Sequence, residues 1–351
     1  MREQRLVPSL DLEVNRAGHN EEQPIRDSAS VPNGMPGGLS VVVPVFNSAQ
    51  SLPLLADRLR AVLNPAYPGS EVILVNDGSR DNSWDVILDL TTQHRWIRGL
   101  NLMRNYGQHN ALLCGVRAAR HEIVVTIDDD LQNPPEEIPF LVQMLDKGYD
   151  VVYGTPEKET HGFLRNLASR MTKMALQGTM GAETARKVSA FRAFRTRIRD
   201  SFRDYTGPFV SMDVLFTWGT QRFTAIPVRN DLRAIGQSNY TVGKLITHGL
   251  NMVTGFSTLP LRLAGITGLV FGIFGFLLMG FVLARTLFNG SSVPGFPFLA
   301  CAISIFSGVQ LFALGIIGEY MARIHFRTMD RPSYVVRSST NDESGDRAAE
   351  V

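Results

Sequence analysis

Hydrophobic residues between positions 39 and 155 recur in two alternating patterns. Short runs rich in Val, Ile and Leu are typical of buried strands, and apolar residues every three or four positions are typical of helices. Strands are expected at residues 39–45, 71–75, 99–102, 122–127 and 150–153. Helices are expected at residues 51–63, 81–90 and 108–119, and another begins at 134–137. This alternation predicts an α/β domain with a doubly wound, Rossmann-like and mostly parallel sheet.

Beyond residue 260 the pattern changes to two long apolar runs. Residues 263–284 and 293–318 contain no charged residue. About 20 apolar residues are enough to cross the hydrocarbon core of a bilayer. A helix in the core of a soluble protein would show a polar face over this length, and neither run has one. We therefore predict two C-terminal transmembrane helices, at residues 261–288 and 293–320.

Basic residues flank these two runs on their outer sides. Lys244 and Arg262 precede the first run, whereas Arg323, Arg327 and Arg331 follow the second, and the connecting loop is almost free of Lys and Arg. Loops rich in Lys and Arg stay in the cytoplasm. The pattern predicts a multi-pass protein whose two termini and sheet domain are cytoplasmic.

The remaining segments complete the predicted organisation. The sheet domain is expected to span residues 38–239, between a disordered N-terminal tail at 1–37 and the membrane helices. Segments near 163–178 and 240–260 mix apolar and basic side chains. We expect them to lie on the membrane surface, although ordinary helices packed on the sheet are the alternative. Residues 321–351 are expected to form a cytoplasmic C-terminal tail, disordered after about Ser338.

Charge and cysteine content narrow the class of protein. The net charge is only +2, so nucleic acid is not an expected partner. The two cysteines, Cys114 and Cys301, lie in different segments, and Cys301 falls within an apolar run. We expect no structural disulfide and no signal peptide, which fits a reducing cytosol.

Three adjacent carboxylates, Asp128, Asp129 and Asp130, end the strand expected at 122–127. Open α/β sheets bind ligands at the carboxyl ends of their strands. Three carboxylates repel one another there unless a cation lies among them, and Mg²⁺ usually brings substrate phosphates with it. The alternative is an acidic helix N-cap before Pro134, but a cap needs only one Asp. The stretch therefore predicts a site for a metal ion and a phosphate.

Four segments carry a resemblance to a known family. They are Val43-Pro44-Val45-Phe46-Asn47, Val75-Asn76-Asp77-Gly78-Ser79, Arg104-Asn105-Tyr106-Gly107-Gln108-His109 and the stretch from Asp128 to Glu137. Together they resemble glycosyltransferase family two, and within it the polyprenyl-phosphate glycosyltransferases. That subgroup includes undecaprenyl-phosphate formamido-arabinose and glucosyl transferases and dolichyl-phosphate mannose synthases. The resemblance covers about residues 38–335.

The resemblance implies a GT-A fold and a divalent ion, Mg²⁺ or Mn²⁺. It implies that a sugar moves with inversion from a nucleotide-sugar donor, which we expect to be UDP-linked, to a polyprenyl phosphate such as undecaprenyl phosphate. It further implies a place in the bacterial inner membrane, in contact with the lipid bilayer. Members of the subgroup form homo-oligomers, often tetramers, so a homo-oligomer is expected here.

The resemblance also implies roles for individual residues. Those expected to bind the nucleotide-sugar are Pro44, Val45, Asn47, Asp77, Asp128, Asp129 and Gln132. Those expected to hold the metal are Asp128, Asp130 and Gln132. Those expected at the acceptor phosphate are Arg192, Arg233, Ser238 and Tyr240, and the catalytic set is Asp128, Asp130, Arg192 and Arg233. Arginine suits a phosphate because its planar fork donates two hydrogen bonds at once.

The chain departs from the family pattern at four places. Ser48 stands where many members have Glu, and Asp129 replaces a small residue between the metal carboxylates. Asn239 replaces a Lys, and Arg186 and Lys187 lie where relatives usually carry an Asp. These changes fit a different sugar or acceptor better than lost activity, because the metal motif is intact.

Two other classes of protein are alternatives to this interpretation. A catalytically weak member acting as a scaffold or flippase partner is the alternative that the substituted positions leave open. A processive polysaccharide synthase would carry Gln-x-x-Arg-Trp beyond the metal motif. Gln93-His94-Arg95-Trp96 has the wrong spacing and precedes that motif, so this class is rejected.

Overall fold

The computed structural model describes residues 37–156, 187–207, 210–231, 259–289 and 295–340. The predicted surface helix near 163–178 lies outside these ranges, as do nearly all residues of the predicted segments 1–37 and 240–260.

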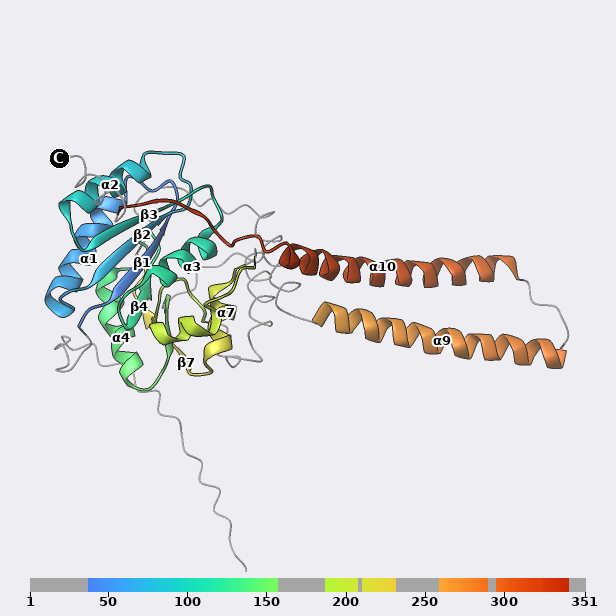
Figure 1. Ribbon diagram of the computed structural model, residues 1–351. Helices are drawn as coiled ribbons and strands as arrows, with labels where there is room; N and C mark the ends of the chain where they lie inside the picture. The colour runs from blue at the N-terminus through green and yellow to red at the C-terminus, as the bar shows by residue number, and fades with distance from the viewer. Residues whose placement is uncertain (1–36, 157–186, 208–209, 232–258, 290–294, 341–351) are drawn as a thin grey trace, which may run out of the picture. The chain divides into compact units, whose positions relative to one another are not determined.

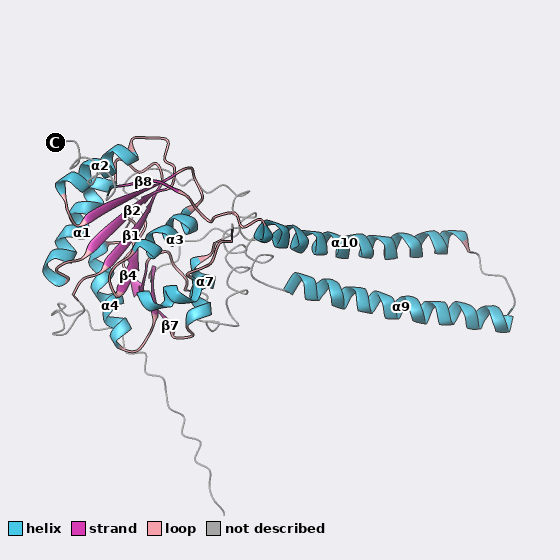
Figure 2. Ribbon diagram, in the orientation of Figure 1, coloured by secondary structure: helices cyan, strands magenta, loops and turns pink. Residues whose placement is uncertain are grey.

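An eight-stranded sheet forms the centre of the fold (Figures 1 and 2), with the strand order β7-β5-β6-β4-β1-β2-β3-β8. The strands are β1 (Ser40–Val45), β2 (Glu71–Asn76), β3 (Ile97–Leu102), β4 (Ile123–Thr126), β5 (Val151–Pro156), β6 (Arg192–Arg195), β7 (Phe223–Val228) and β8 (Val336–Ser339). Strands β6 and β8 run antiparallel to their neighbours, and the other described pairs are parallel. The prediction of a mostly parallel α/β sheet is confirmed.

Helices cover both faces of this sheet. They are α1 (Leu52–Ala66), α2 (Ser83–Gln93), α3 (Gln108–Ala118), η1 (Pro135–Glu137), α4 (Ile138–Asp146), η2 (Thr196–Phe202) and α7 (Met212–Gly219). Helices α1, α2 and α4 bury their apolar sides against one face of the sheet, and α3, η2 and α7 bury theirs against the other.

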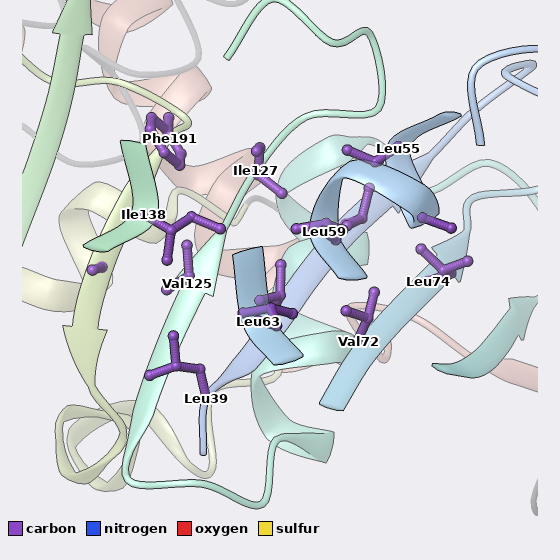
Figure 3. Close-up of a cluster of buried hydrophobic side chains, with 14 of the residues drawn as sticks. Leu39, Leu55, Leu59, Leu63, Val72, Leu74, Val125, Ile127, Ile138 and Phe191 are labelled. Carbon is purple, nitrogen blue, oxygen red and sulfur yellow. The ribbon is translucent and has the colours of Figure 1, made fainter. Parts of the chain in front are cut away.

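The hydrophobic pattern accounts for the first of these two cores. Leu55, Leu59 and Leu63 recur every four residues along α1 and are at most 2% exposed. They lie over side chains of the sheet such as Val72 and Leu74 (Figure 3). Residues one position along the strands, such as Ile73, point to the opposite core. Because both faces are covered, these strands are apolar throughout, as parallel strands usually are.

Two long helices follow the sheet domain in sequence, α9 (Leu259–Asn289) and α10 (Phe296–Thr328). Within them, Leu261–Val282 and Ile305–Ala322 are long and apolar enough to cross a membrane, and neither window is buried by the rest of the chain. The rings of Phe271 and Phe306 pack edge to face, 6.3 Å apart. The prediction of two apolar C-terminal helices is confirmed, and their length and composition are those of membrane spans.

Strand β8 was not predicted from the sequence, which suggested only a tail. After α10 the chain pairs with β3, and the Gly99 N–H donates to Thr340 Oγ1 at 3.0 Å. Ser333 Oγ also donates to the Gly207 carbonyl at 2.9 Å. The residues after α10 are therefore part of the sheet rather than a free tail, and the prediction of disorder after about Ser338 is wrong for Ser339 and Thr340.

Candidate active site

The carboxyl end of β4 carries the predicted metal carboxylates. Asp128 and Asp130 are half-buried, whereas the strand that leads to them is fully buried. Asp128 Oδ1 accepts a hydrogen bond from Gln108 Nε2 at 2.7 Å, and Asp130 Oδ1 accepts one from the Gln132 N–H at 3.1 Å. Leu131, which lies between Asp130 and Gln132, is buried and adopts φ +61°. This turn leaves two carboxylates at the edge of the sheet where open α/β folds bind ligands.

Asp129 faces a different part of the molecule. Its Oδ2 accepts a hydrogen bond from the Phe46 N–H at 3.2 Å, whereas the Ser48 hydroxyl donates to the Phe46 carbonyl at 3.2 Å. Burial raises the pKa of Asp129, and the hydrogen bond from the Phe46 N–H partly offsets that rise. Of the three adjacent carboxylates, the middle one therefore connects β4 to the loop after β1.

Three of the predicted nucleotide-binding residues lie in or directly before that loop, residues 46–49. Pro44 and Val45 are buried at the end of β1, and the exposed Asn47 adopts φ +55°. Asn47 Oδ1 accepts a hydrogen bond from the Arg80 N–H at 2.8 Å. The amide of Asn47 thus supports the neighbouring loop in this structure, and its contact with a nucleotide stays a prediction.

Asp77 lies at the carboxyl end of β2 and is 3% exposed. Its two oxygens accept hydrogen bonds from the N–H groups of Tyr106 and Gly107, at 2.7 and 2.8 Å. Burial raises the pKa of Asp77 to about 6, against the opposing effect of these hydrogen bonds. Asp77 therefore holds the loop between β3 and α3, and each oxygen keeps a further lone pair for a ligand.

Arg192 differs most from its expected setting. It is 1% exposed, its Nε donates to Thr126 Oγ1 at 3.1 Å, and its Nη1 pairs with Asp213 at the start of α7. The same carboxylate accepts a hydrogen bond from the Tyr153 hydroxyl at 3.1 Å. The positive charge of Arg192 is thus paired with an internal carboxylate, whereas the predicted role requires it to bind a phosphate. Its acceptor role stays a prediction, and it would require this buried pair to open.

The other predicted acceptor residues, Arg233, Ser238 and Tyr240, lie outside the described residues. The described residues that precede them lie beside the loop after β4 that carries Asp128 to Gln132, because the Asp231 N–H donates to the Gln132 carbonyl at 2.8 Å. An ion pair between Arg229 and Glu137 at 2.7 Å braces the same stretch.

The donor groups at this edge fit a hard divalent cation. Asp128, Asp130 and Gln132 offer oxygen atoms, which Mg²⁺ and Mn²⁺ prefer. Among the described residues, no group of three or more His, Cys, Asp or Glu side chains is arranged to hold a metal by itself. The metal-binding role of Asp128, Asp130 and Gln132 stays a prediction.

Two contacts of this site were missed by sequence reasoning. Gln108 lies in the motif at residues 104–109, but no role was expected for its side chain, which donates a hydrogen bond to Asp128. Nothing in the sequence singles out Asp213, because a lone acidic residue in the first turn of a helix is common and usually only favours the helix dipole. Only its burial and its pairing with Arg192 distinguish it.

Comparison with known proteins gives a consistent family. A family profile described as Glycosyl transferase family 2 matches residues 40–206. An undecaprenyl-phosphate 4-deoxy-4-formamido-L-arabinose transferase from Serratia proteamaculans (strain 568) is 35% identical over 308 residues, which cover 87% of this chain and 94% of the relative. The protein of the same name from Yersinia enterocolitica serotype O:8 is 34% identical over 316 residues, covering 89% and 97%.

Among solved structures, a glucosyl-3-phosphoglycerate synthase from Mycobacterium tuberculosis in complex with Mn²⁺ and UDP aligns with a TM-score of 0.46 at 20% identity. The alignment covers 62% of this chain and 77% of that chain. A likeness at this level carries no argument about metal or substrate.

Proposed function

Because the chain belongs to glycosyl transferase family 2, we propose that it moves a sugar, with inversion, from a nucleotide-sugar donor to a polyprenyl phosphate. The acceptor class follows the relatives named as undecaprenyl-phosphate transferases, which match this chain over nearly their whole length. The product would be a polyprenyl monophosphate sugar for cell-envelope glycan or lipid A modification. A UDP-linked donor is the first candidate.

One observation carries this proposal. Asp128 and Asp130, the carboxylates proposed to bind a metal and a diphosphate, lie at the carboxyl edge of a sheet whose chain also forms two membrane-length apolar helices. Such helices would hold the sheet domain at the bilayer, where the polyprenyl chain of a lipid acceptor stays while its phosphate reaches the carboxylate edge.

The residues of this chain divide the work of the reaction. When bound, Mg²⁺ or Mn²⁺ would act as a Lewis acid that offsets charge on the departing nucleotide diphosphate. Gln108 and the Leu131 turn would orient Asp128 and Asp130 for that ion, and Asp77, which holds the loop between β3 and α3, would face the nucleoside. The acceptor phosphate is already anionic, with a second pKa near ~6, so it needs little help from a base. Arg233, Ser238 and Tyr240 would align it with the anomeric carbon, which is catalysis by positioning.

Transfer from labelled donors tests this function directly. Full-length protein in lipid nanodiscs would receive undecaprenyl phosphate, Mg²⁺ or Mn²⁺ and a panel of radiolabelled nucleotide-sugars. We expect label in a lipid product that mild acid releases as free sugar, and none when undecaprenol without its phosphate is the acceptor. Equal labelling of the two lipids would contradict a phosphate acceptor.

We further propose that the protein lies in the bacterial inner membrane with its sheet domain and both termini in the cytoplasm. The distribution of Lys and Arg supports this, and so does the return of the chain to β8. Cysteines placed at Ser291 and Ser338, in a background without Cys114 and Cys301, can be probed on intact cells with an impermeant thiol reagent. Labelling at position 291 is expected, and labelling at 338 but not at 291 would reverse the orientation.

A further inference from the structure

The C-terminal segment, residues 333–340, follows α10 and is fixed to the sheet domain by side chains as well as by strand pairing. Its first residue, Ser333, is 4% exposed and donates from its hydroxyl to the Gly207 carbonyl at 2.9 Å. The ring of Tyr334 packs on the core beneath α3 and α7, with the Arg117 guanidinium 5.8 Å from its centroid. Strand β8 then forms the edge of the sheet beside β3 (Figure 2). These contacts make the segment an integral part of the sheet domain.

The same segment holds Met103, the residue that directly follows β3. The Met103 N–H donates to the Val335 carbonyl at 2.9 Å, and the Met103 carbonyl accepts a hydrogen bond from Arg337 Nη2 at 3.1 Å. Both polar backbone groups of Met103 are therefore bound by the C-terminal segment. The contact continues past the end of the strand into the loop between β3 and α3.

That loop carries the contacts that shape the predicted donor site. It donates two backbone N–H groups to the oxygens of Asp77, and Gln108 at the start of α3 donates to Asp128. Asp77 is predicted to bind the nucleotide and Asp128 to bind the metal. A single short stretch after Met103 thus contacts both of these carboxylates.

The loop also packs directly on the turn that follows Asp77. Gly78 in that turn adopts φ +64°, and a Cβ placed on it would lie 2.5 Å from the carbonyl carbon of Arg104 and from the nitrogen of Asn105. The backbones of the two segments are therefore in close contact. Backbone atoms cannot rotate aside as a long side chain can, so a shift of the loop at Met103 is transmitted to the Asp77 turn.

We propose that the C-terminal segment positions the loop between β3 and α3 for the nucleotide-sugar donor, and that Arg337 is a positioning residue in it. The inference deepens the proposed function, on which it rests for the identity of the ligand. Arg337 acts through Met103 and the loop, and it contacts neither substrate. The alternative is that β8 only covers the unpaired edge of β3. Covering that edge would not require any bond to Met103 beyond the strand.

Hydrogen–deuterium exchange of the full-length protein in nanodiscs tests the proposal without relying on activity. Arg337→Ala removes an exposed side chain, so the fold should be kept. In peptides covering residues 103–108, amide exchange should become roughly 5-fold faster, because one hydrogen bond that closes the loop is lost. Arg337→Lys keeps a donor and should lie nearer the wild type. Arg331→Ala is the matched control, since that exposed arginine precedes the segment, and it should exchange as the wild type does.

Binding of UDP with Mg²⁺, measured by calorimetry in the same preparations, shows whether the loop acts on the donor site. Arg337→Ala should weaken UDP binding roughly 5-fold and leave the KM for undecaprenyl phosphate unchanged. Truncation after Pro332 removes several hydrogen bonds together and should weaken UDP binding by roughly 30-fold or more. Arg331→Ala should bind UDP normally.

The two measurements separate positioning of the loop from covering of the sheet edge. Faster exchange confined to β3 and β8 in Arg337→Ala, with normal loop exchange and normal UDP affinity, would overturn the proposal. Equal effects of Arg337→Ala and Arg331→Ala would also contradict it. A wild-type protein that binds no UDP would refute the proposed donor, and exchange of the loop would still decide the positioning role.

Discussion

At the carboxyl ends of β1, β2 and β4, side-chain oxygens hold backbone N–H groups, whereas around β5, β6 and β7 charged side chains hold one another. The first arrangement shapes loops in advance for a ligand of fixed geometry, such as a nucleotide diphosphate. In the second, Arg192 is 1% exposed and pairs with Asp213, so its guanidinium is not presented to a ligand. On the proposed assignment of residues, the donor side is already assembled among the described residues, and the acceptor side has to open an internal pair or use residues after Asp231.

The largest expected effect is a loss of turnover when a carboxylate proposed to bind the metal is removed. Asp130→Asn should lower turnover by at least ~10²-fold, because metal catalysis contributes several kcal/mol to stabilising the transition state. Asp128→Asn should do nearly as much, since it also changes the contact with Gln108. The measurement is initial-rate transfer to undecaprenyl phosphate. Asp57→Asn, an exposed carboxylate on α1, is the control and should be unchanged. Full activity in excess EDTA would refute the metal assignment.

The next prediction concerns the buried pair on the acceptor side. Arg192→Ala should lower the free energy of unfolding by about 3–5 kcal/mol, because it leaves the Asp213 carboxylate buried and uncompensated. Thermal unfolding of the detergent-solubilised protein measures this. Arg197→Ala is the matched control. Its side chain is 63% exposed, although it pairs with Asp150 at 2.7 Å, so a loss below about 1 kcal/mol is expected. Unchanged stability with a raised KM for the lipid would show that Arg192 faces the acceptor after all.

A smaller effect should appear at the acceptor segment. Arg233→Ala should weaken use of the lipid roughly 10- to 150-fold, because a charge-assisted hydrogen bond is worth about 1.5–3 kcal/mol. Affinity for the nucleotide, measured by calorimetry, should stay nearly unchanged. Arg229→Ala serves as the control, since that side chain is 55% exposed and pairs with Glu137. Loss of nucleotide affinity with normal lipid dependence would move Arg233 to the donor side.

The smallest predicted effect is a dependence on pH through Asp77. Because its pKa is raised to about 6, this carboxyl takes up a proton where exposed aspartates remain ionised. The protonated form turns one acceptor into a donor, which conflicts with the N–H groups of Tyr106 and Gly107. Nucleotide affinity should therefore fall several-fold between pH 7 and pH 5. Asp77→Asn should remove this dependence, and a variant that keeps the wild-type profile would assign it to another group.

Much of the fold was predictable because its signals are local. The order of strands and helices from residue 39 to 155, the carboxylates after β4 and the two apolar helices all follow from short stretches of sequence. Periodicity and hydrophobicity act between neighbouring residues, so no tertiary contact was needed to infer them. The same holds for placing Asp128 and Asp130 at the carboxyl edge of a parallel sheet.

Tertiary structure alone decided which polar groups meet. Strand β8 pairs with β3, the next residue, Thr340, accepts a hydrogen bond from the Gly99 N–H 241 residues away, and Asp129 reaches Phe46 across 83 residues. Arg192 faces inward because β6 pairs with β4 and β5 in a register that puts its side chain beside Thr126 and Tyr153. A shift of one residue would turn it to the other face. Sequence determines what each segment can form, but register and helix packing determine whether an arginine meets a phosphate or an internal carboxylate.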